Sequence, residues 1–249
     1  MSRFFSIFLV LPLSISLAHK TFSPMPDQSS PTPVTFTEIE VANPVSAPAL
    51  SHGYLALGDS YTIGESVPIY ENFPYQLVQL LRGRGMPFQA PEILAKTGWT
   101  TDELQEGINR TKFLPSYDLV TLLVGVNNQY RGRTTENYAP EFESLLKQAI
   151  RFAGGKKDHV VVLSIPDWGA TPYAEGRDPG KIGREIDAYN AVNKRIALQY
   201  GVYYVDITPG TREAVQDKSL VARDGLHPSG KDYARWAMAV AERIAGIQF

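Results

Sequence analysis

The chain of 249 residues contains no cysteine, which excludes disulfides, thiolate zinc sites and cysteine nucleophiles. Neither sign of charge predominates, since 24 lysines and arginines stand against 26 aspartates and glutamates. No basic run is long enough to follow a phosphate backbone, so we expect no nucleic-acid partner. Histidines and carboxylates do not cluster at metal-ligand spacing, and we expect neither a metal nor another cofactor.

Apolar runs of about 20 residues, the length that spans a bilayer, are also missing. The longest run, 4–17, follows Arg3, contains a proline and leads into small residues that end at Ala18. This pattern is typical of a secretory signal peptide, so we expect residues 1–18 to be removed near Ala18 on export to the periplasm or the medium. Prolines then recur among serines and threonines, which predicts an extended arm or linker over 19–50.

From residue 51 onward, short apolar runs alternate with longer segments whose apolar residues recur every three or four positions. This alternation predicts an α/β domain over 51–249, a three-layer α/β/α sandwich around a five-stranded, mainly parallel sheet. The expected strands cover 54–57, 92–95, 119–124, 160–165 and 203–207. Capping-box spacing marks two helix starts, at Thr100 with Glu103 and at Ser229 with Asp232.

Ser60 directly follows the first strand, at the pole of the sheet where open parallel sheets bind ligands. A serine needs a base to become a nucleophile. His227, three residues after Asp224, is the candidate, because the carboxylate can fold back and orient its imidazole as in a Ser-His-Asp triad. The alternative is a histidine that only packs in a turn. The remaining histidines lie at the opposite pole or in the N-terminal tail: His52, His159 and His19.

Two further strands end in groups that can donate hydrogen bonds to an oxyanion. Gly98 follows the second strand and can present its backbone N–H without a side chain in the way. Asn127 follows the third strand and carries an amide. Each residue has a simpler explanation in turn geometry, which favours glycine and asparagine after a strand.

In this order, and each at the end of a strand, these stretches resemble the four sequence blocks of the SGNH (GDSL-type) hydrolase family. The resemblance covers most of the predicted domain. It implies an SGNH hydrolase fold in which Ser60 is the nucleophile and Asp224 and His227 complete the triad. It also implies an oxyanion hole made by the Ser60 N–H, Gly98 and Asn127.

Two positions depart from the usual family pattern. Asn128 stands where the family usually has aspartate, which predicts a different hydrogen-bond network around that loop. Tyr61 replaces the usual leucine after the serine and predicts different packing beneath the site. Neither change removes a catalytic group. No serine lies in G-x-S-x-G, which argues against the α/β-hydrolase fold.

These features lead us to expect an exported serine esterase that hydrolyses carboxylic esters of lipid, lysophospholipid or O-acetyl type. Three aromatic residues beside the blocks are candidates for pocket walls, although such residues are as often core: Trp99, Tyr61 and Tyr130. An O-acyltransferase of the same fold and a non-catalytic, surface-tethered binding module are the alternatives. Nothing in the sequence indicates an oligomeric state.

Overall fold

The computed structural model describes residues 51–249, so the predicted signal peptide and Pro-rich arm lie outside the described residues. Five strands, all parallel, form one sheet in the order β2-β1-β3-β4-β5. This confirms the predicted sheet. The strands are β1 (Tyr54–Asp59), β2 (Glu92–Lys96), β3 (Leu119–Leu123), β4 (Val160–Leu163) and β5 (Tyr203–Val205).

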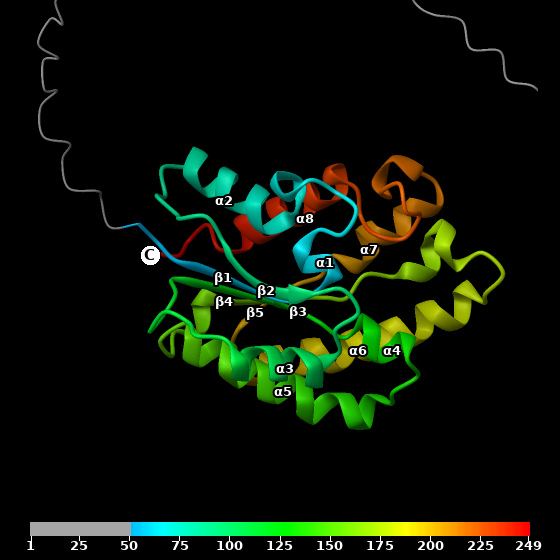
Figure 1. The fold of residues 1–249 in the computed structure, drawn as a ribbon, viewed down its shortest axis with the longest axis horizontal. Coiled ribbons are helices and arrows are strands. Elements are labelled where there is room, and N and C mark those ends of the chain that lie inside the picture. Colours follow the sequence, from blue (N-terminus) through cyan, green and yellow to red (C-terminus); the bar gives the residue numbers. More distant parts are fainter. Residues whose placement is uncertain (1–50) are drawn as a thin grey trace, which may run out of the picture. The chain divides into compact units, whose positions relative to one another are not determined.

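Helices cover both faces of the sheet and make the three layers predicted from the sequence (Figure 1). On one face α2 packs against α8, and on the other lie α3, α5 and α6. The helices are α1 (Ser60–Ile63), α2 (Phe73–Gly83), α3 (Thr101–Arg110), α4 (Val126–Tyr130), α5 (Thr135–Phe152), α6 (Pro179–Tyr200), α7 (Thr208–Thr211) and α8 (Gly230–Arg243). Short 3-10 turns are η1 (Ile69–Glu71), η2 (Lys157–His159), η3 (Trp168–Ala170), η4 (Pro172–Ala174), η5 (Arg212–Val215) and η6 (Lys218–Leu220).

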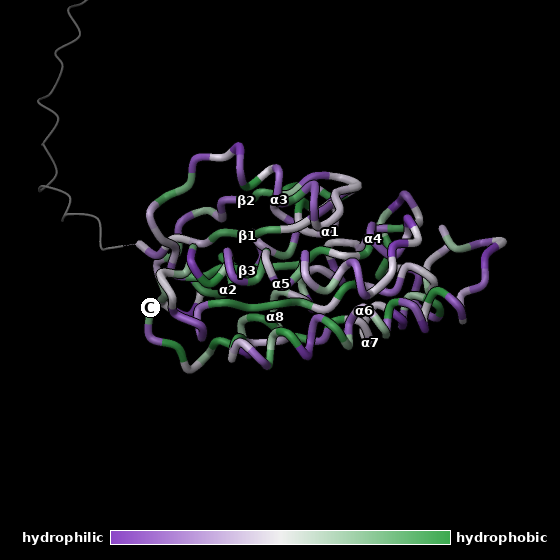
Figure 2. Tube along the Cα trace, turned by 90° about the horizontal axis from the view of Figure 1, so that it is seen from below, coloured by the Kyte–Doolittle hydropathy of each residue, from purple (hydrophilic) through white to green (hydrophobic). Residues whose placement is uncertain are grey.

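The core lies on both faces of the central strands. Every residue of β1, β3 and β4 is buried, because helices cover both sides of the sheet. Such strands read as nearly continuous apolar runs, which is why they stand out in the sequence. In Figure 2 most of β1 and β3 is green, the colour of hydrophobic residues. Within residues 51–249 no helix has the length and apolar character needed to cross a membrane.

Two strands end earlier than their apolar runs. β4 and β5 each stop two residues short of the predicted end. The Asn190 side chain bonds the N–H and the carbonyl of Ile165 at 2.8 and 3.0 Å, and the Ser164 hydroxyl accepts the N–H of Ile207 at 2.8 Å. Side chains therefore replace a neighbouring strand as hydrogen-bond partners, and the chain leaves the sheet at this point.

The two predicted capping boxes have different outcomes. The Thr100 N–H donates to Glu103 at 2.9 Å, which confirms the first. Ser229 does precede α8, but its hydroxyl donates to a carbonyl of η6 at 2.6 Å, and Asp232 accepts from the Trp236 indole at 3.2 Å. The second box is therefore wrong, because Asp232 is drawn into the core, where it is 2% exposed.

Asp59, the last residue of β1, is a buried carboxyl group. One oxygen accepts the Tyr61 N–H at 3.0 Å and caps α1, while Oδ2 has no partner among the described residues. Burial raises the pKa of Asp59 to about 7 and, in the same way, that of Asp232 to about 6. Both groups therefore hold a proton in the folded state at pH values where the unfolded chain has lost it. Their effect on stability becomes less favourable as pH rises from about 4 to 7.

We expect the free energy of unfolding to be higher at pH 5 than at pH 8. Asp59→Asn keeps an oxygen for the cap but cannot ionise, so it should reduce that difference by about 3 kcal/mol, at 1.36 kcal/mol per pH unit over the roughly two units between pH 5 and the pKa of Asp59. Urea unfolding at the two pH values measures the change, with the exposed Asp158→Asn as the control. The same pH dependence in the parent and Asp59→Asn would contradict this account.

Candidate active site

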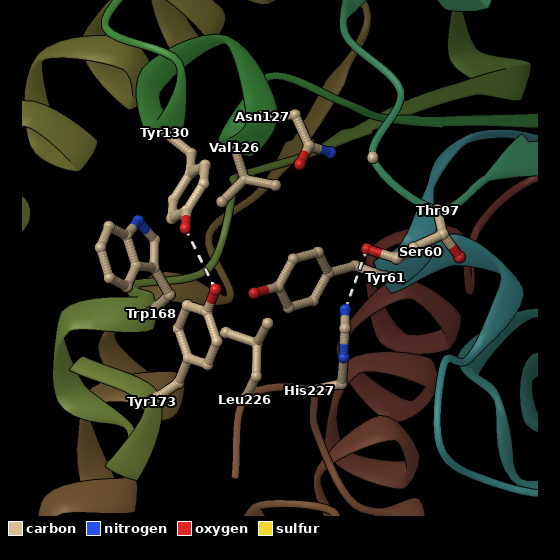
Figure 3. Close-up of a pocket in the computed structure, with 11 residues that line it drawn as sticks. Ser60, Tyr61, Thr97, Val126, Asn127, Tyr130, Trp168, Tyr173, Leu226 and His227 are labelled. Atoms are coloured by element: carbon tan, nitrogen blue, oxygen red, sulfur yellow. Dashed lines mark hydrogen bonds between the residues drawn. The ribbon is translucent and has the colours of Figure 1, made fainter. Parts of the chain in front are cut away.

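Ser60 and His227 meet at the carboxyl end of the sheet, although 167 positions separate them in the chain. Ser60 begins α1, directly after β1, and His227 lies in the loop before α8. The Ser60 Oγ and His227 Nε2 are 2.9 Å apart, and both side chains are buried (Figure 3). The packing of α1 against the end of the sheet requires a glycine at position 58. A Cβ on Gly58 would overlap the Leu123 carbonyl and the Thr62 side chain. The structure thus brings together the predicted nucleophile and its base.

Asp224 folds back onto His227, as the three-residue spacing predicts. Its Oδ2 lies 2.6 Å from the His227 Nδ1, and its Oδ1 accepts the backbone N–H groups of Leu226 and His227 at 3.0 Å. Burial raises the pKa of Asp224, but hydrogen bonds from Ser66, His227 and the backbone outweigh it and lower the pKa to about 2. Asp224 is therefore a carboxylate at neutral pH. A hydroxyl bonded to an imidazole that a carboxylate orients is the arrangement that activates a serine.

Ser66 is a member of this group that sequence reasoning missed. Its hydroxyl donates to the Asp224 Oδ2 at 2.7 Å, the same oxygen that faces the imidazole. Ser66 has φ +66°, and among residues 51–249 it is the only non-glycine residue with positive φ. This conformation costs about 1 kcal/mol or more in a residue with a Cβ. No pattern around Ser66 signals its partner, which lies 158 positions away.

The two predicted oxyanion donors line the same cavity as Ser60 and His227. Gly98 follows β2 with φ +82°, and its carbonyl accepts a hydrogen bond from Arg131 at 2.6 Å. Asn127 lies in the first turn of α4 and donates one amide hydrogen to the Trp99 carbonyl at 3.0 Å. Because an amide carries two hydrogens, one remains for a ligand.

The other described histidines lie at the opposite end of the sheet, as predicted. His52 forms a bridge with Phe88 just before β1. His159 precedes β4 and its Nδ1 lies 2.6 Å from the Asp118 carbonyl. Both histidines therefore lie at the end of the sheet opposite Ser60. His19 lies outside the described residues.

Residues 56–235 match the model of the GDSL-like lipase/acylhydrolase family. The chain belongs to this family. It is accordingly an ester-bond hydrolase by family, and small-molecule esters are the substrates that such a family implies. No curated protein sequence matches the chain.

Several solved structures share the fold of this GDSL-family enzyme. The acetylxylan esterase Axe2 of Geobacillus stearothermophilus has a TM-score of 0.61 at 19% identity, over 79% of this chain and 95% of its own. TesA has a TM-score of 0.61 at 18% identity, over 78% and 98%. LAE5, an alpha/beta hydrolase enzyme from the metagenome of Lake Arreo, Spain, has a TM-score of 0.59 at 18% identity, over 80% and 97%. The SGNH hydrolase fold predicted from the sequence is confirmed.

Asn128 shows how the GDSL-family enzyme accommodates its departure from the usual aspartate. The fully buried amide accepts the Thr101 N–H at 3.1 Å and donates to the Thr101 hydroxyl at 2.6 Å. The Thr101 hydroxyl in turn donates to Glu141. Because that hydroxyl gives its proton to Glu141, its remaining partner has to be a donor, which an amide supplies and a carboxylate does not. The network ties α4 to the start of α3.

Aromatic residues form one wall of the cavity, which has a volume of about 140 Å³ (Figure 3). Tyr61 lies beside the imidazole, with ring centroids 4.9 Å apart, and Tyr130 also lines the cavity. Trp168 and Tyr173, from the segment after β4, complete the wall, and the sequence did not single them out. Trp99, by contrast, does not line the cavity, because its ring packs against Gly107 of α3.

Proposed function

We propose that this enzyme hydrolyses carboxylic esters with Ser60 as nucleophile, His227 as general base and Asp224 as the group that orients His227. The observation that carries the proposal is the unbroken contact from Ser60 Oγ to His227 Nε2, 2.9 Å, and from His227 Nδ1 to Asp224 Oδ2, 2.6 Å. These contacts border a cavity large enough for a ligand. A Ser-His-Asp arrangement of this kind supports acyl transfer on unrelated folds.

In the proposed reaction Ser60 Oγ attacks the ester carbonyl carbon while its proton passes to His227 Nε2. The carbonyl oxygen becomes an oxyanion that accepts hydrogen bonds from the N–H groups of Ser60 and Gly98 and from the Asn127 amide. When the carbon–oxygen bond of the ester breaks, His227 returns the proton to the leaving alcohol. Water then attacks the acyl carbon of the acyl-serine and gives a proton to His227 Nε2. When the bond from the acyl carbon to Ser60 Oγ breaks, His227 returns this proton to Oγ, and the acid leaves.

The cavity favours a short acyl group or a sugar over a long lipid chain. Its volume of about 140 Å³ is close to that of a cavity of about 150 Å³ that holds a benzene molecule, so about six carbon atoms fill it. Tyr130 and Tyr173 are 44% and 42% exposed at its rim and offer ring faces to a sugar. The likeness to an acetylxylan esterase supports the same class of O-acetyl or short-chain ester.

Hydrolysis of 4-nitrophenyl esters from acetate to palmitate tests the proposal on the protein without residues 1–18. We expect kcat/KM to be highest for acyl groups of two to about six carbons, because longer chains exceed the cavity. Ser60→Ala should abolish turnover by removing the nucleophile. Equal rates in the parent and Ser60→Ala would contradict the assignment of Ser60, and a maximum at palmitate would contradict the substrate class.

Ser66 acts in this proposal as a positioning residue for Asp224. Ser66→Ala removes the donor and keeps a Cβ at positive φ, whereas Ser66→Gly removes the donor and relieves the backbone. We expect both to lower kcat about 3- to 10-fold with little change in KM, and the glycine variant to be the more stable. The acidic limb of the pH profile should move to higher pH, because a carboxylate that loses a donor attracts the protonated imidazole more strongly. Parent-like kcat in Ser66→Gly would contradict this role.

We also propose that the enzyme acts after export. The support is the pattern of residues 1–18, a basic residue, an apolar run and small residues ending at Ala18. Expression of the full chain should give a protein in the periplasm or the medium whose N-terminus, determined by sequencing, lies near His19. An intact Met1 on the active protein in the cytoplasm would contradict export.

A further inference from the structure

Arg177 does not itself line the Ser60 cavity, but it stacks on three of the rings that do, and it has no role in the proposed chemistry. Its guanidinium carbon is 5.2, 5.1 and 5.6 Å from the ring centroids of Tyr130, Trp168 and Tyr173, respectively. All three rings line the cavity. One nitrogen, Nη2, donates to the Tyr130 hydroxyl at 3.2 Å, and that hydroxyl lies 3.1 Å from the Tyr173 hydroxyl. The charge of Arg177 is therefore held beside the cavity.

The positive charge of Arg177 is not neutralised within residues 51–249. No carboxylate in this part of the chain lies within 4 Å of its guanidinium, and the side chain is exposed. The neighbouring Asp178 is committed elsewhere, since its carboxylate caps α6 by accepting the Lys181 N–H at 2.9 Å. By comparison, Arg212, which contacts the same segment, is paired with Asp167 at 2.8 Å.

A guanidinium in this setting is suited to bind an anion. It carries five N–H donors in a planar fork that matches carboxylate and phosphate oxygens, and only one is engaged with Tyr130. The aromatic rings hold the fork in place, so little conformational freedom is lost when a ligand binds. Apolar acyl groups would make no use of this charge.

We propose that Arg177 binds a carboxylate or phosphate carried by the ester substrate, whose acyl group or sugar occupies the cavity. This inference rests on the proposed function and narrows its substrate class to short-chain esters with an anionic substituent. The anion belongs either to the acyl group or to the alcohol, and the chemistry at Arg177 is the same in both cases. The aromatic wall then limits the size of the ester that binds, and Arg177 favours esters that carry a negative charge.

Two matched pairs of esters test the inference and locate the anion. The first pair is 4-nitrophenyl hexanoate and mono(4-nitrophenyl) adipate, which have acyl groups of six carbons and differ in a terminal carboxylate. The second pair is the acetyl esters of glycerol and of glycerol 3-phosphate, assayed by acetate release. In the parent enzyme we expect the anionic member of at least one pair to have a kcat/KM about 10- to 100-fold higher than its neutral partner. This range corresponds to the strength of hydrogen bonds between charged groups.

Arg177→Gln should remove this preference, mainly through a higher KM for the anionic ester, and added salt should weaken it in the parent. Arg184→Gln is the matched control, because it removes the same charge from the exposed start of α6, where the side chain stacks on none of the three rings that hold Arg177. It should keep the preference.

Three outcomes would overturn the inference. The first is equal kcat/KM within both pairs in the parent, and the second is an equal loss on neutral and anionic esters in Arg177→Gln, which would indicate a purely structural role. The third is a preference that Arg184→Gln loses as fully as Arg177→Gln, which would indicate general charge rather than a site. Failure of the proposed function is distinguishable, because the parent would then hydrolyse neither the neutral nor the anionic esters.

Discussion

The hydrogen bonding of the Asp224 carboxylate is the constraint on which the site depends. Two backbone N–H groups, from Leu226 and His227, hold one oxygen, and Ser66 and the imidazole share the other. These donors keep the carboxylate charged in spite of its partial burial, since they lower its pKa to about 2. They also fix the loop before α8, so that the His227 Nε2 reaches Ser60 at the end of β1. One short turn thereby joins the last part of the domain to the first strand.

Features that cost stability gather around this turn. Ser66 has a backbone conformation that disfavours a side chain. Asp59 is a carboxyl group buried next to Ser60, and one of its oxygens has no hydrogen-bond partner within residues 51–249. The surrounding sheet compensates for them, because β1, β3 and β4 are buried along their whole length. A rigid, fully covered sheet can hold strained or poorly solvated groups in one place, which a loosely packed site cannot.

The proposed reacting groups and the aromatic wall of the cavity come from different segments of the chain. Ser60 and His227 lie after β1 and before α8, whereas the aromatic residues of the wall come mainly from α4 and from the segment between β4 and α6. The segment from β4 to α6 also carries Arg177 and is anchored to the loop that holds Asp224 and His227 by the Tyr173 N–H, which donates to the Gly225 carbonyl at 2.9 Å. Changes in this segment can therefore alter which ester is bound without moving Ser60 or His227.

Local patterns in the sequence determined the five strands, the first capping box and the positions of Ser60, Gly98, Asn127, Asp224 and His227. Buried parallel strands are apolar throughout, and groups that follow such strands meet at one pole, so short-range information is sufficient. Only the tertiary structure decided that Ser66 bonds Asp224 and that Asp232 is buried. It also decided that Trp168 and Tyr173 line the cavity while Trp99 does not, and that Arg177 stacks on both of these lining rings. These contacts join segments far apart in the chain, and packing between helices and loops sets them, which no local spacing of residues encodes.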